Sequence, residues 1–324
     1  MTHLDSAGAW VLAELLQRWR KVGAQVDLRN FPPAYASLLD MAEKQMAIQA
    51  AQAVTDPHLP VPRLEVLGRQ GGAVLEQGIA LLAFIGESAV ALAGCVAHPA
   101  RFRWRPVLYN IRSAGFDALP IVGLLSFLLG IVVAYQGAGQ LRQYGANIFV
   151  ADLVGLSMLR EFAPLMTAII VAGRSGSSYA AQIGTMSVSE EIDAMLTLGI
   201  SPQEMLVLPK LFALLIALPL LTVFADLLGV LGGMLMAQAQ LGVSFDEFAE
   251  RFAKAISVTS YLTGIGKAPV FAAIIVIIGC FQGIRTTGGA DSVGRHTTRS
   301  VVQAIFLVVV ADALFSVAFS MLDI

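Results

Sequence analysis

Long apolar segments, separated by short polar and charged stretches, occupy the chain from residue 117 onward. Each provides roughly the 20 residues that the hydrocarbon core of a bilayer requires for a helical crossing. The five predicted spans are 117–139, 149–173, 205–239, 265–283 and 300–322. This pattern predicts an all-α polytopic membrane protein.

Residues 73–97 form another apolar segment that is long enough to cross a membrane. Glu76 and Glu87 are 11 residues apart, which returns them to nearly the same helical face. A lengthwise polar stripe favours a helix that lies in the membrane interface. The basic and aromatic cluster 101–105 follows, of the kind that anchors a protein at the cytoplasmic surface. We therefore interpret 73–97 as a non-spanning elbow helix.

The first 62 residues are more polar and form a separate segment. Apolar periodicity predicts helices over 7–20 and 35–54, with a short strand over 24–28 between them. Pro57, Pro60 and Pro62 then form a linker. The chain is thus expected to divide into a cytoplasmic segment, 1–62, and a membrane domain, 63–324.

The opening motif, His3-Leu4-Asp5-Ser6-Ala7-Gly8, resembles the loop and helix start of a STAS domain. That family is a small α/β module found beside some transporters. The resemblance implies a STAS-like segment that lacks the strands preceding this loop in the family. Ser6 lies near the family's phosphorylatable serine, although a helix N-cap is the simpler interpretation.

Composition agrees with a membrane protein, because 56% of the 324 residues are hydrophobic and 14% are charged. A net charge of −2 gives no reason to invoke nucleic acid. Cys95 and Cys280 lie in apolar surroundings, so neither a disulfide framework nor a thiolate metal site is expected. Residues 1–30 lack the pattern of a secretory signal, which favours a cytoplasmic N-terminus.

Loop charges orient the predicted spans, since the side richer in arginine and lysine is cytoplasmic. Eight arginines fall on one side: Arg101, Arg103, Arg105, Arg112, Arg174, Arg285, Arg295 and Arg299. Arg142, Arg251 and Lys254 fall on the other side. The N-terminus is therefore predicted inside and the C-terminus outside, with an amphipathic helix over 244–255 on the outer side.

Arg160 and Glu161 are charged residues at membrane depth in the second predicted span. An ionisable residue there costs at least a few kcal/mol unless it is paired or faces water, so it is a candidate functional residue. Pro164 one turn later predicts a kink. The alternative is a salt bridge that only fixes helix packing. Asp152, Asp226 and Asp312 have no basic residue at i±4 and are interpreted as polar helix contacts or helix-end positions.

The stretch from Gly173 to Ser178 is rich in glycine and serine, but it is not a nucleotide-binding loop. The chain has no GxxxxGK[ST] motif, and Gly266-Lys267 is followed by Ala268. These small residues are expected to break the helix and to allow close helix packing. ATP is therefore expected to bind to another chain.

Residues 187–202 predict a short amphipathic helix between two spans. Ser187 and Glu190 have capping-box spacing, and Gly199 supplies the stop. Its apolar face includes Ile192, Met195 and Leu196, and its acidic face includes Glu190, Glu191 and Asp193. It is either a solvated acidic helix or a protrusion that fits a groove in a partner.

Four motifs together resemble the MlaE-type permease family, the membrane subunits of ABC transporters that move lipids with MCE-domain partners in double-membraned bacteria. They are LLSFLLGIVVAYQG (124–137), LREFAPLMTAIIVAGRSGSSYAAQIGTM (159–186), EEIDAMLTLGISP (190–202) and GGADSVGRHTTRSVV (288–302). The resemblance covers about 73–324 and implies five spans with an elbow helix. It also implies a homodimer in the bacterial inner membrane that moves phospholipid to or from a periplasmic MCE partner and maintains outer-membrane asymmetry.

The same resemblance assigns roles to individual residues. Arg160 and Glu161 fall where the family meets lipid, with Tyr135 and Gln136 near the outer end of the first span. A separate ATPase subunit would dock on Glu190, Glu191, Ile192, Asp193, Met195 and Leu196. A STAS-type subunit is a further candidate partner. The resemblance implies no catalytic residue, metal ligand or cofactor in this chain.

Three other classes of protein compete with this interpretation. A STAS-linked secondary anion transporter of the sulfate-permease type needs many more spans and inverted repeats. A membrane enzyme of lipid metabolism would need an acidic metal motif or a histidine-rich box. A membrane-anchored regulatory scaffold would use the STAS-like segment as its working part. Co-purification of an ATPase and of phospholipid distinguishes the permease from all three.

Overall fold

The computed structural model describes residues 5–21, 23–24, 26, 28, 31–53, 63–97 and 104–322. Within these residues all regular structure is helical, and no strand is present. The chain divides into two compact units, Met1–Glu76 (unit 1) and Gln77–Ile324 (unit 2). His3 and the linker prolines Pro57, Pro60 and Pro62 lie outside the described residues.

Unit 1 contains two packed helices, α1 (Ser6–Lys21) and α2 (Pro33–Ala53). Their contact is a small core of Ala9, Ala13, Leu16, Leu39, Ala42 and Met46. The N-cap of α1 is Asp5 rather than Ser6, because Asp5 Oδ1 accepts from the Gly8 amide at 2.7 Å. The strand predicted over 24–28 is not seen at its described residues, Ala24, Val26 and Leu28. The STAS-like character of this segment stays a prediction.

Six helical stretches in the described chain are long and apolar enough to cross a membrane, one more than the five predicted spans. They are Gly71–Cys95, Trp104–Gln143, Asn147–Val188, Gln203–Leu241, Val258–Ile284 and Ala290–Met321. The additional stretch belongs to α3 (Arg63–Ala97), which contains the predicted elbow helix. Length and composition alone therefore allow α3 to span as well.

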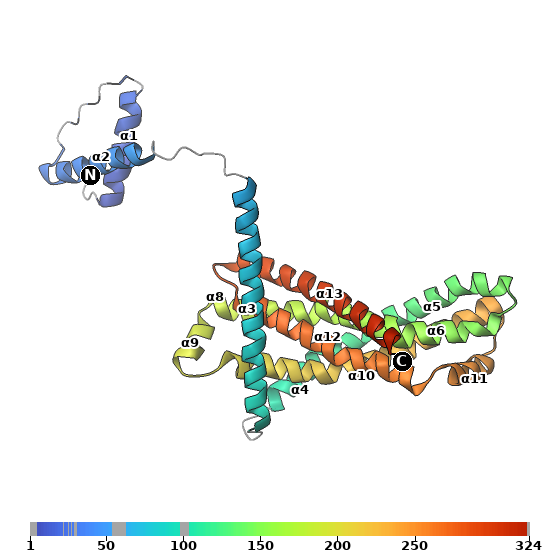
Figure 1. The fold of residues 1–324 in the computed structure, drawn as a ribbon. Coiled ribbons are helices and arrows are strands. Elements are labelled where there is room, and N and C mark those ends of the chain that lie inside the picture. The colour runs from blue at the N-terminus through green and yellow to red at the C-terminus, as the bar shows by residue number, and fades with distance from the viewer. Residues whose placement is uncertain are drawn as a thin grey trace. The chain divides into compact units, whose positions relative to one another are not determined.

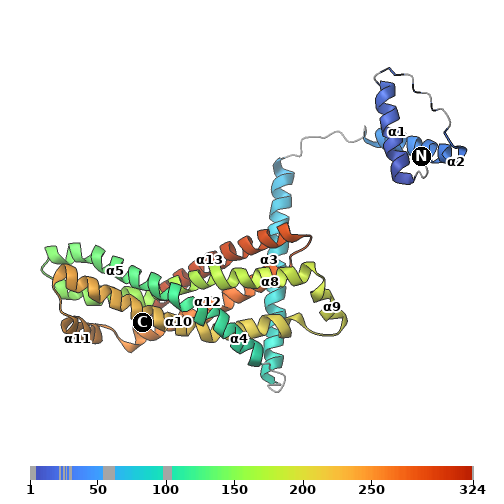
Figure 2. The ribbon, with the colours of Figure 1, turned by 180° about the vertical axis from the view of Figure 1, so that it is seen from behind.

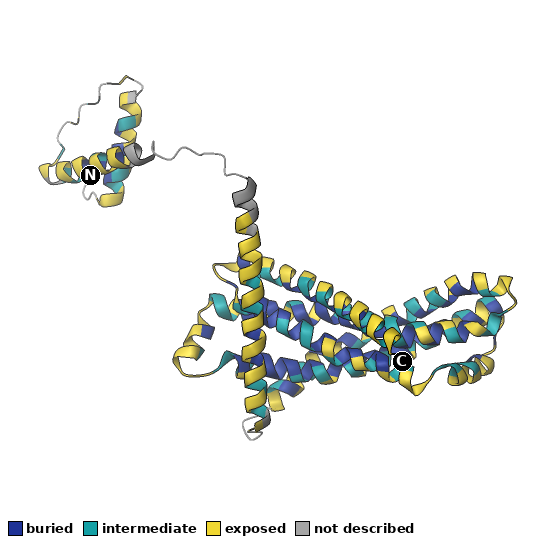
Figure 3. Cartoon of the chain, in the orientation of Figure 1, coloured by how far each residue is buried: buried dark blue, intermediate teal, exposed yellow. Residues whose placement is uncertain are grey.

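Contacts of α3 within unit 2 explain part of its polar stripe. Gln203 Nε2 donates to Glu87 Oε2 at 3.0 Å, and the Phe84 ring packs on the Phe281 ring at 5.7 Å. Residues 77–97 run across the long helices of unit 2 rather than alongside them (Figures 1 and 2). Much of their surface is exposed (Figure 3). Glu87 thus has an intramolecular partner, whereas the interfacial placement of α3 stays a prediction.

The other long stretches of unit 2 are built from several helical pieces. The first joins α4 (Trp104–Ala114), η2 (Phe116–Ala118) and α5 (Leu119–Gln143). The second joins η3 (Asn147–Phe149), α6 (Val150–Ser157), η4 (Met158–Phe162), α7 (Ala163–Val171), η5 (Ala172–Gly176) and α8 (Ser177–Val188). The third joins η6 (Gln203–Val207) and α10 (Leu208–Leu241), and the last two are α12 (Val258–Ile284) and α13 (Ala290–Met321).

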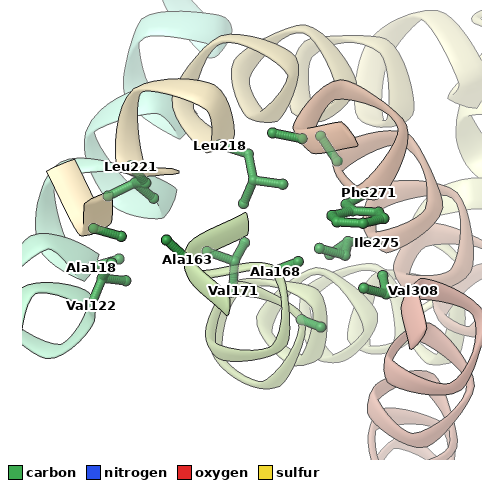
Figure 4. Close-up of a cluster of buried hydrophobic side chains, with 14 of the residues drawn as sticks. Ala118, Val122, Ala163, Ala168, Val171, Leu218, Leu221, Phe271, Ile275 and Val308 are labelled. Carbon is green, nitrogen blue, oxygen red and sulfur yellow. The ribbon is translucent and has the colours of Figure 1, made fainter. Parts of the chain in front are cut away.

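Helix α10 packs against α5, α7 and α12 (Figures 1 and 2). Figure 4 shows the core that these helices share, with Leu218 of α10, Val171 of α7 and Phe271 of α12 pointing toward one another. A Cβ on Gly130 of α5 would overlap the carbonyl oxygen of Gly229 on α10. The two backbones therefore touch, as small residues permit in membrane helices.

The second stretch is one continuous helix with two π turns, η4 and η5. The expected Gly/Ser break after Gly173 is wrong, because the backbone continues through η5 into α8. Ser177 Oγ donates to the carbonyl oxygens of Gly173 and Arg174, at 2.6 and 2.8 Å. Close packing of the small residues is confirmed, since a Cβ on Gly279 of α12 would lie 3.0 Å from the Gly176 carbonyl oxygen.

Two short helices, α9 (Glu191–Thr197) and α11 (Phe245–Ala255), lie at opposite ends of the bundle (Figures 1 and 2). The predicted amphipathic helix over 244–255 is confirmed as α11. Its capping box is complete, because Ser244 Oγ accepts from the Glu247 amide at 3.2 Å and Glu247 Oε2 accepts from the Ser244 amide at 3.0 Å.

Candidate functional site

A lysine bridges two acids from different helices inside the bundle. Lys267 of α12 places Nζ 2.8 Å from Glu161 Oε2 on η4 and 2.9 Å from Asp312 Oδ1 on α13. The Lys267 side chain is fully buried, at 0% exposed, whereas that of Glu161 is 34% exposed. The lysine thus holds three long helices together and leaves one of its acids partly accessible.

Two further side chains complete the group, which we call the Lys267 cluster: Arg160, Glu161, Lys267, Asp312 and Ser316. Ser316 Oγ donates to Glu161 Oε2 at 2.9 Å. Arg160 Nε lies 3.7 Å from Glu161 Oε1, a longer contact than either ion pair of Lys267, and the Arg160 side chain is 23% exposed. With two cations and two carboxylates the cluster is balanced in formal charge, which lowers the cost of burying it.

The backbone of η4 supplies another acceptor. Pro164 has no N–H, so it cannot donate to the carbonyl of Arg160 four residues earlier. That carbonyl oxygen instead accepts from Lys267 Nζ at 3.1 Å. The π turn η4 ends immediately before α7, whose second residue is Pro164, and the kink predicted there stays a prediction. Such single-turn π segments occur frequently at functional sites.

A glycine on α12 allows the lysine to reach this turn. A Cβ on Gly264 would overlap the carbonyl oxygen of Leu159 and would lie 3.5 Å from the Cα of Arg160. The helix α12 therefore packs directly on the backbone of η4. Lys267 follows Gly264 by three residues, which places it on the same side of the helix about one turn later.

Sequence reasoning found Arg160 and Glu161 but did not connect them with the other three members of the cluster, Lys267, Asp312 and Ser316. Asp312, interpreted as a polar helix contact or a helix-end position, makes such a contact, because it pairs with Lys267 of another helix. Asp152 does likewise, since its Oδ1 accepts from Arg251 Nε of α11 at 2.7 Å. The search at i±4 found neither basic partner. Lys267 itself carried a usable signal, because it is a cation within the predicted span 265–283.

Tyr135 and Gln136 are not brought next to Arg160 and Glu161. They line a different cavity of about 340 Å³ near the end of α5, together with Arg142 and Gln240. Arg142 fixes this end of α5 by donating to the backbone oxygen of Gln240. Their assignment to a lipid cavity stays a prediction.

Residues 187–202, predicted to contact an ATPase, differ from the expectation in how their helix begins. The Ser187–Glu190 capping box is wrong, because Ser187 Oγ donates to the carbonyl oxygens of Ile284 and Thr286, at 3.2 and 2.9 Å. Glu190 instead adopts a left-handed conformation, with φ 60°, before α9. Gly199, with φ 72°, follows the end of α9 as predicted. The contacts of Ser187 tie the end of α8 to the turn between α12 and α13.

Burial separates the predicted docking residues of α9 into two groups. Ile192 is 6% exposed and packs within this chain, so it is not available to a partner. Met195 is half-buried, and Glu190, Glu191 and Asp193 are exposed. The exposed apolar side chains are Leu196, at 56%, and Leu198, at 75%, so they offer the apolar part of any partner contact.

The described residues contain no group of three or more histidine, cysteine, aspartate or glutamate side chains that could hold a metal ion. The Lys267 cluster consists of paired charges and one hydroxyl. Its partly exposed members, Arg160 and Glu161, can pair with a charged group that enters from beside η4.

Comparison with known proteins places the chain among membrane permeases. The family described as Permease MlaE matches residues 107–318, which include the Lys267 cluster and α9. A probable ABC transporter permease protein of Rickettsia typhi is 36% identical over 210 residues, covering 65% of this chain and 81% of that protein. The chloroplastic protein TRIGALACTOSYLDIACYLGLYCEROL 1 of Arabidopsis thaliana is 33% identical over 216 residues, covering 67% of this chain and 62% of that one.

Proposed function

The chain belongs to the MlaE permease family, and from that premise we propose that it is the membrane subunit of an ATP-driven transporter of phospholipid. The observation that carries the proposal is the Lys267 cluster, a set of paired charges within apolar helices whose members Arg160 and Glu161 remain partly exposed. Ionisable residues at membrane depth mark substrate pathways. The apolar surroundings suit acyl chains, and the charges suit a zwitterionic or anionic headgroup.

Arg160 is the residue we assign to the lipid phosphate. Its 3.7 Å contact with Glu161 is the weakest ion pair of the cluster, so a phosphate competes with it most readily. Arginine also offers two parallel donors to phosphate oxygens. Glu161, held by Lys267 and Ser316, then sets the orientation of Arg160 and repels a second anion. The cluster binds the headgroup without any covalent step.

Energy comes from a separate ATPase in this proposal, because the sequence has no phosphate-binding loop. The ATPase would press on α9, which follows the continuous helix Asn147–Val188. Both π turns lie within that helix, and a π turn can accommodate a shift in register more easily than regular α-helix. Motion at α9 would thus reach η4 and change the access of lipid to Arg160.

The assembly that we propose follows the family: a homodimer with two ATPase subunits and a periplasmic MCE-domain partner. We place it in the bacterial inner membrane with its N-terminus in the cytoplasm and its C-terminus in the periplasm. The distribution of loop arginines supports this orientation. In this arrangement α9 faces the cytoplasm and α11 the periplasm, consistent with their positions at opposite ends of the bundle (Figure 1).

Replacing Glu161 with glutamine tests the proposed lipid role. The variant keeps the shape of the side chain but removes the charge that orients Arg160, and we expect ATP-dependent phospholipid movement to fall by about tenfold or more, equivalent to about 1.4 kcal/mol. The measurement is transfer of labelled phospholipid in vesicles that contain the complete complex. Asp40→Asn on α2, an exposed acid outside unit 2, is the matched control. Unchanged lipid flux in an intact complex would count against the role.

Charges introduced at the exposed apolar residues of α9 test the ATPase contact. We expect Leu196→Glu with Leu198→Glu to reduce the co-purifying ATPase by about tenfold or more, since apolar anchors dominate such contacts. The control is Ala194→Glu with Thr197→Glu, which adds the same charge to the same exposed helix but removes no large apolar group. Equal retention of the ATPase by both double variants would exclude this surface.

A further inference from the structure

A second cavity lies between α10, α11, the start of α12 and Leu159 of η4, and no member of the Lys267 cluster lines it. Its volume is about 490 Å³, which falls within the range of roughly 300–1,000 Å³ that is typical of small-molecule sites. Apolar side chains such as Val223, Leu227 and Phe252 form most of its wall. The polar side chains that line it are Asp226, Ser257 and Tyr261.

Asp226 is the unusual member of this wall. It lies in the interior of α10 and is 4% exposed. Neither carboxyl oxygen has a hydrogen-bond partner in the part of the chain that the structure describes. Asp152 and Asp312, by contrast, each have a basic partner on another helix. Asp152 and Asp312 thus each have a counter-charge, whereas Asp226 has none among the described residues.

Burial of an unpaired carboxylate is costly, so Asp226 keeps its proton until a cation from outside this chain pairs with it. The partner must carry positive charge to match Asp226 and an apolar body to match the remaining walls. Two aromatic rings, those of Phe252 and Tyr261, line the same cavity and can also attract a cation through their faces. An anionic headgroup does not suit this cavity, because no basic side chain lines it.

We propose that this cavity is a binding site for lipophilic cations, with Asp226 as the counter-ion. The ligand class comprises ammonium or phosphonium groups carried on an apolar body. The Asp226 oxygens are enclosed by neighbouring side chains, so the cation engages them after the Asp226 side chain rotates toward the cavity. The site adds a second ligand class to a protein whose proposed transport substrate is a phospholipid.

Tetraphenylphosphonium and tetraphenylborate provide a matched pair of probes, because they share shape and size but carry opposite charge. Radiolabelled tetraphenylphosphonium should bind saturably to the purified full-length protein in detergent. Tetraphenylborate, measured in a separate sample because the two ions form an insoluble salt when mixed, should not bind saturably. We expect Asp226→Asn to weaken binding by about tenfold or more, the effect of losing one charge-assisted contact. Thr222→Val, one turn earlier on α10, should bind as the unaltered protein does, since Thr222 does not line the cavity.

A cavity-filling variant keeps the test decisive if Asp226→Asn does not fold. Ala253→Phe on α11 places a ring in the cavity while leaving the carboxyl in place, and it should also abolish saturable binding. Equal binding of the phosphonium and the borate, or full binding by a folded Asp226→Asn variant, would overturn the proposal. The lipid-transport proposal is tested separately, by phospholipid transfer in the Glu161→Gln variant. A negative result for cation binding therefore does not count against it.

Discussion

Replacing Lys267 with methionine is expected to destabilise the protein by about 3–5 kcal/mol and to abolish ATP-driven phospholipid movement. The lysine is fully buried and is the shared cation of Glu161 and Asp312, at 2.8 and 2.9 Å. Methionine fills a similar volume but leaves two carboxylates close together without their counter-ion. The carbonyl of Arg160 also loses the donor that replaces the missing amide of Pro164.

Thermal unfolding of the purified protein and lipid transfer in vesicles measure the two effects separately. A triple variant, Lys267→Met with Glu161→Gln and Asp312→Asn, removes both ion pairs of Lys267 and leaves the partly exposed Arg160 as the one charged member of the cluster. It distinguishes a packing role from a lipid-binding role. If the charges serve lipid binding, the triple variant should regain much of the stability while transport stays lost. Transport at the unaltered rate in the triple variant would instead support the alternative that the ion pairs only fix helix packing.

The charged residues of the second span were predictable from the sequence, whereas their partners required the fold. Glu161 and Lys267 are 106 residues apart, and Lys267 and Asp312 are 45 apart. Periodicity identifies neighbours three or four residues apart on one helix, so a search at i±4 cannot find a pair between helices. The sequence shows Lys267 within an apolar segment. To identify it as a candidate site residue, however, every charge in the predicted spans has to be considered, and not only charges that form pairs within one helix.

The expected helix break after Gly173 failed for a different physical reason. Glycine and serine favour turns in water, where exposed backbone groups are solvated. Inside a bilayer or a helical bundle those groups need partners, which favours continued helix. The chain satisfies this requirement with the π turn η5 and with the Ser177 hydroxyl. The absence of a Cβ at Gly176 lets the backbone pack closely on α12.

The continuation of the helix through η5 and α8 also explains why the predicted Ser187–Glu190 capping box is wrong. Because α8 continues to Val188, Ser187 lies in its last turn rather than before the start of a new helix. Its hydroxyl is then directed to the turn between α12 and α13. By contrast, the Ser244–Glu247 box follows a left-handed glycine, Gly242, that ends α10, so a new helix does start there.

Replacing Gly264 with alanine is the second change expected to have a large effect. The new methyl group would overlap the carbonyl oxygen of Leu159, a backbone atom of η4 that cannot turn aside as a side chain can. The helix α12 must therefore move away from η4, and Lys267, about one turn later, moves away from Glu161. We expect a loss of about 1–3 kcal/mol in stability, as for other overpacked contacts, together with a fall in lipid transfer of about tenfold or more.

Gly266→Ala is the matched control for this change, because it makes the same substitution two residues later in the same helix. A Cβ at Gly266 meets no atom within 4 Å. Alanine is also the better helix former by about 1 kcal/mol, so the control should keep or slightly raise the unfolding midpoint. Only the Gly264 variant should lose transport, since only Gly264 lies against the turn that carries Arg160 and Glu161. Equal behaviour of the two variants would show that close contact between α12 and η4 is not what holds the Lys267 cluster together.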